Sequence, residues 1–299
     1  MNIFRFDGEH LLQTNQDISA DTDEVIIVSH EELAQIPLPV HWRQHITSGK
    51  AATRIDSFEG MLFISLDIMG EPGCIAAIWS PGQLFLSGTA DSPLLARLTD
   101  RLSRGEGQPI PLPGTLQGLQ QLLSLAADHN QGLLERTEEA ISALETQVMH
   151  YDRSVSGHSF IELRRGLLTL KRHTQPLEEI CDLLHENEGK LLPPEAAGAL
   201  APIFRRCGRI NAEIVNLENY IAQVRDAYQN HLDLRLNRSM MTLTVLAAVF
   251  LPLSLIVGWY GMNFPMPEFT WPLGYGYVII LSLICLIFSI WYFRRKGML

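Results

Sequence analysis

The chain has 299 residues, of which 46% are hydrophobic and 19% charged, and its formal net charge at pH 7 is −10. This hydrophobic content excludes a disordered chain. The shortage of basic residues argues against a nucleic-acid partner, because binding to phosphates needs cations that displace counterions. Residues 240–299 hold one acidic and three basic side chains, a local charge of +2, which leaves −12 on all other residues together. The composition predicts an acidic, water-soluble body joined to an apolar tail.

The first part of the body, residues 1–114, has the pattern of an α+β domain. Short apolar or alternating runs bounded by Gly and Pro predict strands; they are Glu24–Ser29, Met61–Ile68, Cys74–Trp79 and Gln83–Ser87. Asp91–Leu102 starts with capping residues and an early proline, which predicts a helix. Successive prolines at 109–113 interrupt both helix and sheet, so they mark the end of this domain.

Residues 115–238 are predicted to form a helical stalk region. Apolar residues recur at three- and four-residue spacing over Leu116–Val148. A second helix is expected over Ser159–His185, interrupted at Pro176. A third begins at Pro194 or Glu195 and meets no strong breaker before Tyr260, which gives a helix about 100 Å long. A helix of this length cannot pack around one small core, so we expect a stalk that carries the body to a membrane.

Two uncharged apolar runs, 240–260 and 275–293, lie within the last part of the chain, 239–299. Each is close to the roughly 20 residues with which a helix crosses a bilayer. Trp and Tyr gather at the ends of both runs, as they do at membrane interfaces. Two buried core helices of a globular domain are the alternative, but successive uncharged runs of this length favour membrane spans joined by a short loop, 261–274.

Basic residues flank the two spans unequally. Arg225, Arg235 and Arg238 precede the first span and residues 294–296 follow the second, whereas the loop 261–274 has no Lys or Arg. The positive-inside rule therefore predicts that both termini and the acidic body are cytoplasmic and that the loop lies outside. The N-terminal residues lack the basic start and apolar stretch of a signal peptide, so insertion is expected from the C-terminal end.

No sequence motif indicates an enzyme. The chain has no nucleophile elbow, Walker loop or dinucleotide fingerprint, so we expect no catalysis and no organic cofactor. The four cysteines are scattered and match no zinc-knuckle spacing, which favours a reducing cytoplasm. His41 and His45 are spaced to offer two imidazoles from one helix to a metal, and ordinary surface histidines are the alternative.

The first span is followed directly by Gly261-Met262-Asn263, with Tyr260 before it and Phe264 after it, and then by Met266-Pro267-Glu268. Here the sequence resembles the CorA family of divalent-cation (magnesium) channels, whose hallmark is Gly-Met-Asn at the outer end of the first of two C-terminal spans. The run 251–254 and the basic cluster 294–296 also look like that family. The resemblance implies a predominantly helical, funnel-shaped homopentamer in a bacterial-type inner membrane, with passive uptake of Mg²⁺, Co²⁺ or Ni²⁺.

The resemblance also implies that the first span lines the pore, since two helices of one chain cannot enclose a water-filled channel. One stripe at helical spacing mixes small, polar and Met/Leu side chains: Asn237, Met240, Thr244, Ala247, Leu251, Ser254 and Gly258. Plain helix–helix packing is the alternative for this stripe. Met240, Leu243 and Leu251 match the family's apolar constrictions, which gate by dewetting, and Asn237 matches its polar position at the cytoplasmic end.

Neither span holds a carboxylate, and Mg²⁺ gives up its water reluctantly. We therefore expect a ring of Asn263 side-chain carbonyls at the outer mouth to capture a largely hydrated ion, with backbone carbonyls near Gly261 as further contacts. Glu268, repeated around the ring, is expected to concentrate cations at the entrance. Met262 completes the motif.

The cytoplasmic metal sensors of the family are acidic residues between subunits. Asp91, Glu218 and Asp226 are candidates by charge and region, and a solvated surface is the alternative for each. Mg²⁺ would then be both cargo and regulator, bridging carboxylates and holding the channel closed when its internal level is high. Two other functions stay open: a zinc transporter of the ZntB branch, proton-coupled or not, and a membrane-anchored cytoplasmic scaffold or sensor that conducts nothing.

Overall fold

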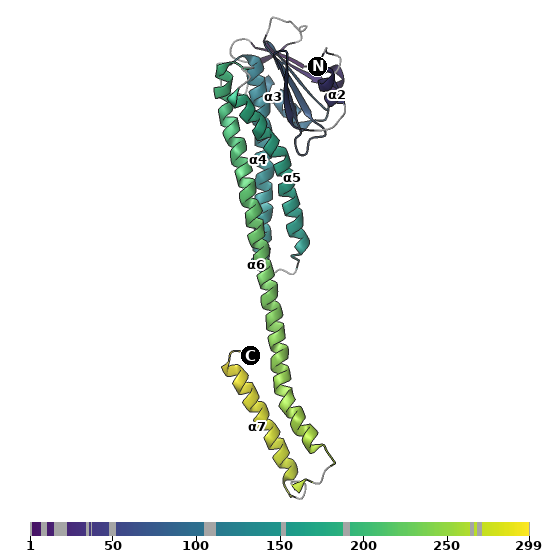
Figure 1. Cartoon of the computed structure of the whole chain (residues 1–299), viewed down its shortest axis with the longest axis vertical. Coiled ribbons are helices and arrows are strands. Elements are labelled where there is room, and N and C mark those ends of the chain that lie inside the picture. The colour runs from purple at the N-terminus through teal and green to yellow at the C-terminus, as the bar shows by residue number, and fades with distance from the viewer. Residues whose placement is uncertain are drawn as a thin grey trace. The chain divides into compact units, whose positions relative to one another are not determined.

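The computed structural model describes residues 2–6, 11–14, 23–33, 36, 38–47, 52–104, 112–150, 154–187, 192–263, 266–267 and 271–298. The chain divides into two compact units, Met1–Val224 and Arg225–Leu299. The strands and the helices α1 to α5 belong to the first unit, α7 belongs to the second, and residues of α6 belong to both (Figure 1).

The first unit is built on a seven-stranded sheet in the order β2-β1-β3-β7-β6-β5-β4. Its strands are β1 Asn2–Phe6, β2 Leu11–Thr14, β3 Glu24–Ser29, β4 Arg54–Phe58, β5 Met61–Leu66, β6 Ile75–Ser80 and β7 Gln83–Gly88. Neighbouring strands are antiparallel except β3 and β7, which run parallel with Val25 opposite Leu84. A parallel pair needs a long crossover, and here the crossover carries two helices and three further strands.

The helices are α1 His30–Leu33, α2 Val40–Thr47, α3 Pro93–Ser103, α4 Gly114–Met149, α5 Gly157–Glu186, α6 Pro194–Tyr260 and α7 Gly274–Arg295. Four predicted strands and the predicted helices agree with this structure to within about two residues at most ends, which is the usual spread between assignments. The predicted interruption at Pro176 is wrong, because α5 is continuous through it. A proline removes its own N–H from the helix and its ring presses on the carbonyl four residues earlier. The buried apolar face of α5 offsets this cost. Strands β1, β2 and β4 and helices α1 and α2 were not predicted.

The sheet separates two apolar cores because alternate side chains of a strand point to opposite faces. Leu62, Ile64 and Leu66 of β5 are buried in one core with leucines of α3 and α4. Phe63 lies in the other core with Trp42 of α2. Helices therefore cover both faces, α1 and α2 on one and α3 and α4 on the other.

Helix α4 crosses the sheet at close range. A Cβ atom added to Gly118 would lie 2.8 Å from Cγ2 of Val25 and 3.0 Å from Cδ2 of Leu84. Any other residue would push the helix away from the strands, so glycine at this position sets how closely α4 packs on β3 and β7.

Trp42 anchors the core between α2 and the sheet. Its side chain is fully buried and stacks on Phe63, with ring centroids 5.3 Å apart. Its indole Nε1–H donates a hydrogen bond of 2.9 Å to the carboxylate of Asp56 on the edge strand β4. This bond, the first of several causes, lowers the pKa of Asp56, because it stabilises the ionised carboxylate.

The lowered pKa of Asp56 predicts a pH dependence of stability. The unfolded chain holds the Asp56 proton more tightly than the folded chain, so this contribution is fully present above the ordinary pKa of about 3.9 and is lost as pH falls through the lower folded value. We expect the midpoint of chemical unfolding of the wild type to exceed that of Asp56→Asn at pH 7, and the gap to shrink below about pH 4. A gap that is constant from pH 7 to pH 3 would contradict this assignment.

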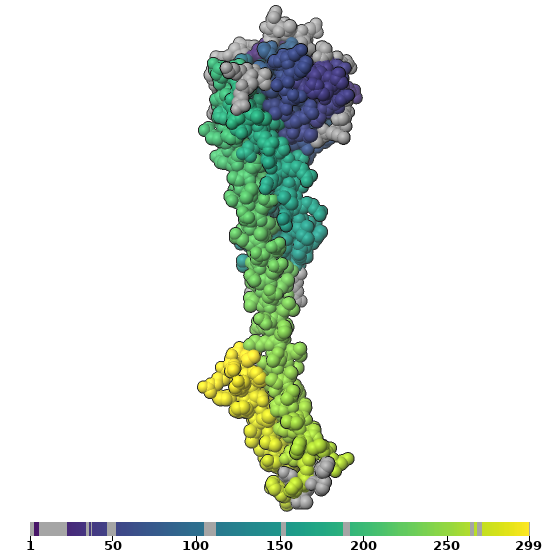
Figure 2. Space-filling model, viewed as in Figure 1, coloured from purple at the N-terminus to yellow at the C-terminus, as the bar shows by residue number. Residues whose placement is uncertain are grey.

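The second unit presents apolar side chains to its surroundings. Two helices, α6 and α7, are long and apolar enough to cross a membrane. Large apolar residues are exposed on both helices, among them Leu251 at 72% and Phe288 at 62%. Helix α7 is the yellow segment in Figure 2. Exposing an apolar surface of this extent to water is unfavourable. Contact with the hydrocarbon of a lipid bilayer removes that cost.

Candidate functional site

The Gly-Met-Asn motif forms the turn that ends α6. The N–H of Gly261 donates to the carbonyl of Val257 at 2.9 Å, and that of Met262 donates to Trp259 at 3.3 Å. A Cβ atom added to Gly261 would lie only 2.9 Å from the Val257 oxygen. Glycine therefore allows the chain to close this turn immediately after the last helical residue.

Asn263 and Met262 project from this turn into the surroundings and are exposed. Within the described part of the chain, no hydrogen bond of the Asn263 amide is found, so its carbonyl oxygen is available to a ligand. Phe264 and Glu268, the predicted entrance residue, lie outside the described residues. The nearby Trp271 packs edge-on against Tyr277 at the start of α7, with ring centroids 6.2 Å apart.

A groove of about 510 Å³ separates the end of α6 from α7. Its lining comes from both helices: Leu253, Val257, Tyr260 and Gly261, and Tyr275, Val278, Ile279, Ser282, Leu283 and Leu286. Two further α6 residues on this side, Val245 and Val249, are buried. These positions define the face of α6 that is turned toward α7.

The predicted stripe lies on the opposite face of α6. Counting about 100° per residue, the eight predicted pore residues centre roughly 145° away from the face turned toward α7. All eight are exposed: Asn237, Met240, Leu243, Thr244, Ala247, Leu251, Ser254 and Gly258. In the described part of this chain, the stripe residues therefore do not serve packing between α6 and α7. This face of α6 is free to contact something else.

The polar side chains of the stripe are uncharged, and one of them forms a hydrogen bond within the helix. The Thr244 hydroxyl donates to the Met240 carbonyl at 2.8 Å. The three predicted constriction residues, Met240, Leu243 and Leu251, are 67–72% exposed. None of the eight predicted pore residues carries a charge, so this face of α6 is neutral along the stripe.

The acidic sensor candidates are separate in this chain. Asp91 is exposed before α3, where the neighbouring carboxylate of Glu71 accepts from Ser92 Oγ–H at 2.5 Å and from the N–H of Leu94 at 3.0 Å. Glu218 pairs with Lys171 at 3.3 Å, and exposed Asp226 pairs with Arg225 at 3.2 Å. Among the described residues, no three His, Cys, Asp or Glu side chains are grouped to hold a metal ion.

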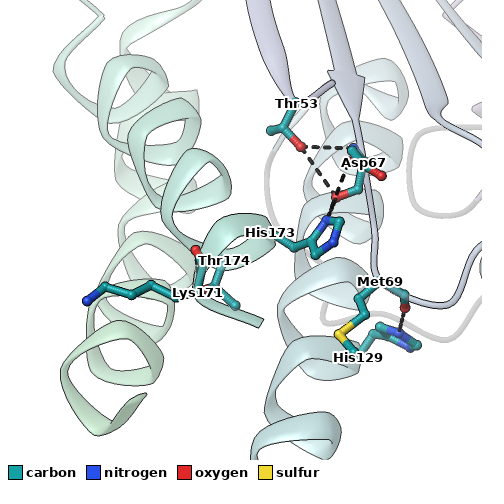
Figure 3. Close-up of polar contacts among 7 residues, drawn as sticks. All are labelled: Thr53, Asp67, Met69, His129, Lys171, His173 and Thr174. Carbon is teal, nitrogen blue, oxygen red and sulfur yellow. Dashed lines mark hydrogen bonds and ion pairs between the residues drawn. The ribbon is translucent and has the colours of Figure 1, made fainter. Parts of the chain in front are cut away.

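Two histidines tie the loop after β5 to the helices beneath the sheet. His173 of α5 donates from Nδ1 to the carbonyl of Asp67 at 3.1 Å, and His129 of α4 donates from Nε2 to the carbonyl of Met69 at 2.8 Å (Figure 3). Thr53 accepts from the N–H of Asp67 at 2.8 Å. These bonds satisfy loop carbonyls, so the cluster positions the loop and needs no ligand.

The two histidines of α2 have separate polar partners. His41 contacts Asp56 at 3.1 Å and His45 contacts Ser65 at 3.2 Å, so each imidazole has its own partner.

Sequence reasoning missed a different pair: the buried thiols of Cys181 on α5 and Cys207 on α6 contact each other. The Cys181 thiol donates a hydrogen bond to the Cys207 sulfur. This bond, together with burial, raises the pKa of Cys181, so this thiol stays protonated at neutral pH.

Comparison with known proteins gives matches over most of the chain. The family described as "CorA-like Mg2+ transporter protein" matches residues 30–295. The chain is 27% identical to the cobalt/magnesium transport protein CorA of Thermotoga maritima over 179 residues, 60% of this chain and 51% of the relative. It is 23% identical to the zinc transport protein ZntB of Klebsiella pneumoniae over 180 residues, 60% of this chain and 54% of the relative. The matched stretch thus spans about half the length of these curated relatives.

Solved structures agree with the fold. The CorA magnesium transporter of Methanocaldococcus jannaschii superimposes with a TM-score of 0.82 at 16% identity, covering 100% of this chain and 99% of that one. The full-length CmaX protein gives 0.75 at 18% identity, covering 99% and 97%. These likenesses confirm the predicted combination of an α/β domain, a long helix and two apolar C-terminal helices. From the match over residues 30–295, the chain belongs to the CorA-like Mg²⁺ transporter family.

Proposed function

We propose that this protein is a channel for passive uptake of Mg²⁺, with Co²⁺ and Ni²⁺ as further cargo, in the inner (plasma) membrane. The observation that carries the proposal is Asn263, an exposed amide on a tight turn at the end of an apolar helix. Family membership supports the transport of divalent cations. Both termini and the first unit lie in the cytoplasm, as the basic flanks of the spans favour.

The conducting unit is a homopentamer in which α6 of each subunit faces the axis. One side of α6 packs against α7 of the same subunit. The exposed stripe on its other side therefore lines the pore. A hydrated ion enters through five Asn263 carbonyls, with backbone carbonyls of Gly261 beside them and Glu268 raising the local cation concentration. The membrane potential drives entry with about 2.3 kcal/mol per charge for each 100 mV.

The gate consists of the apolar rings of Met240, Leu243 and Leu251, which exclude water when they are close together. Intracellular Mg²⁺ closes the gate by bridging carboxylates of neighbouring subunits, for which Asp91, Glu218 and Asp226 are the candidates. Glu218 must exchange Lys171 for the metal, so this site would respond only to high Mg²⁺. Low internal Mg²⁺ leaves the carboxylates to repel one another, and the rings separate.

Ion flux into proteoliposomes tests this proposal. Purified protein is reconstituted, a negative internal potential is imposed, and entry of Mg²⁺, Co²⁺, Ni²⁺ and Zn²⁺ is followed with and without a proton gradient. We expect Mg²⁺ entry that needs the potential and no proton gradient. Entry no faster than into empty liposomes would instead indicate a non-conducting scaffold. Zn²⁺ entry that requires a proton gradient, without Mg²⁺ entry, would assign the protein to the ZntB type.

A further inference from the structure

The end of α7 carries three consecutive cations, Arg294, Arg295 and Lys296, directly after an uncharged run. All three are exposed. Within the described part of the chain, none of them forms an ion pair with a carboxylate. The carbonyls at a helix end attract cations weakly, but one helix end holds only about half a unit of negative charge, which leaves most of this cluster uncompensated.

Two aromatic rings near the end of α7 hold two of these cations, Arg295 and Lys296, in place. The guanidinium carbon of Arg295 lies 5.4 Å from the ring centroid of Trp291, and the ammonium of Lys296 lies 5.3 Å from that of Tyr292. Both rings are about half exposed. Trp and Tyr prefer the headgroup level of a bilayer, so cations stacked on them are held at the depth of the lipid phosphates.

Helix α6 places two more cations at the same depth. Arg238 precedes Tyr260 by as many positions as Lys296 follows Gly274, and each distance is about 33 Å of helix, close to one hydrocarbon thickness. Arg235 lies one turn further from Tyr260 and is exposed as well. The two helices therefore bring five cations to one surface of the membrane, against a single described carboxylate nearby, Asp233.

We infer that Arg235, Arg238, Arg294, Arg295 and Lys296 form a cation band that binds the headgroups of anionic phospholipids. A cluster of four to eight juxtamembrane Lys and Arg side chains is the usual size of such a site. The occupant is a lipid rather than a soluble phosphate, because the aromatic rings fix the cations at the bilayer surface. The inference rests on the membrane insertion proposed above and is independent of which ion passes.

Spin-labelled lipids test the cation band. The full-length protein is reconstituted in phosphatidylcholine bilayers with trace spin-labelled phosphatidylglycerol or phosphatidylcholine, and the protein-immobilised fraction of each label is measured by electron paramagnetic resonance. We expect wild type to prefer phosphatidylglycerol by at least about threefold, since each juxtamembrane cation contributes up to about fivefold at low salt. The preference should fall as chloride is raised.

Three variants make the test specific. Arg294→Gln/Arg295→Gln/Lys296→Gln should remove most of the preference, and Arg235→Gln/Arg238→Gln should remove a smaller part of it. The matched control, Arg164→Gln/Arg165→Gln/Arg209→Gln, removes three exposed charges of the first unit and should keep the wild-type preference. Equal immobilisation of both labels by wild type would overturn the inference, as would inorganic phosphate abolishing the preference where chloride of equal ionic strength does not. Asn263→Ala should leave the lipid preference unchanged, so failure of the channel proposal and failure of the cation band are distinguishable.

Discussion

Replacing Asn263 with alanine is expected to lower Mg²⁺ entry into proteoliposomes by at least about tenfold, because each subunit then loses the side-chain oxygen that receives the hydrated ion. In the described structure this amide has no role in holding the turn, which is closed by the N–H groups of Gly261 and Met262. The variant should therefore fold and reconstitute like wild type. Entry is measured with an internal fluorescent Mg²⁺ indicator at a fixed membrane potential.

The matched control is Asn230→Ala, which makes the same change at an exposed position of α6 outside the apolar run. It should conduct like wild type. If Asn263→Ala conducted as well as Asn230→Ala, ion capture by the amide ring would be wrong. If both variants and wild type were silent, the chain would be an anchor or sensor and no channel.

Replacing Trp42 with alanine is expected to destabilise the first unit by about 3–5 kcal/mol, the usual loss when a large aromatic side chain is removed from a core. The indole is fully buried, stacks on Phe63 and binds Asp56. The cavity left behind lies between α2 and the sheet. Chemical unfolding of the protein in detergent, followed by circular dichroism, measures the change.

Trp42→Phe keeps an aromatic ring at the same position. It removes the N–H donor and part of the buried indole volume, so a loss of about 1–3 kcal/mol, smaller than that for alanine, is expected, with Asp56 left solvated. Equal losses for Trp42→Ala and Trp42→Phe would show that an aromatic ring at this position adds nothing to the packing of α2 on the sheet.

The membrane part was predicted well from the sequence because its signal is long and uniform. An uncharged run of about 20 residues has few alternative structures, and the predicted spans end within two residues of the ends of α6 and α7 there. Strands β5, β6 and β7 were visible for a similar reason, as short apolar runs between turns. Asn263 was predicted to capture the ion because it occupies the last position of the Gly-Met-Asn motif.

Features that depend on a distant partner were not visible. The edge strand β4 is polar and partly exposed, and its pairing with β5 makes it a strand. Cys181 and Cys207 meet only because α5 packs on α6. The sequence also could not show that the predicted pore stripe lies on the face of α6 away from α7. Helical spacing groups residues on one face, but it does not say which face packs against another helix.

The division of the chain at Val224 also has a consequence for biosynthesis. Every described strand lies before that residue, as do both apolar cores of the sheet and the helices that cover them. A ribosome needs about 4 to 15 s to make residues 225–299, at ~5–20 residues per second. The first unit therefore has time to fold in water before the last apolar helix leaves the ribosome, and the nascent protein reaches its membrane with its soluble part already assembled.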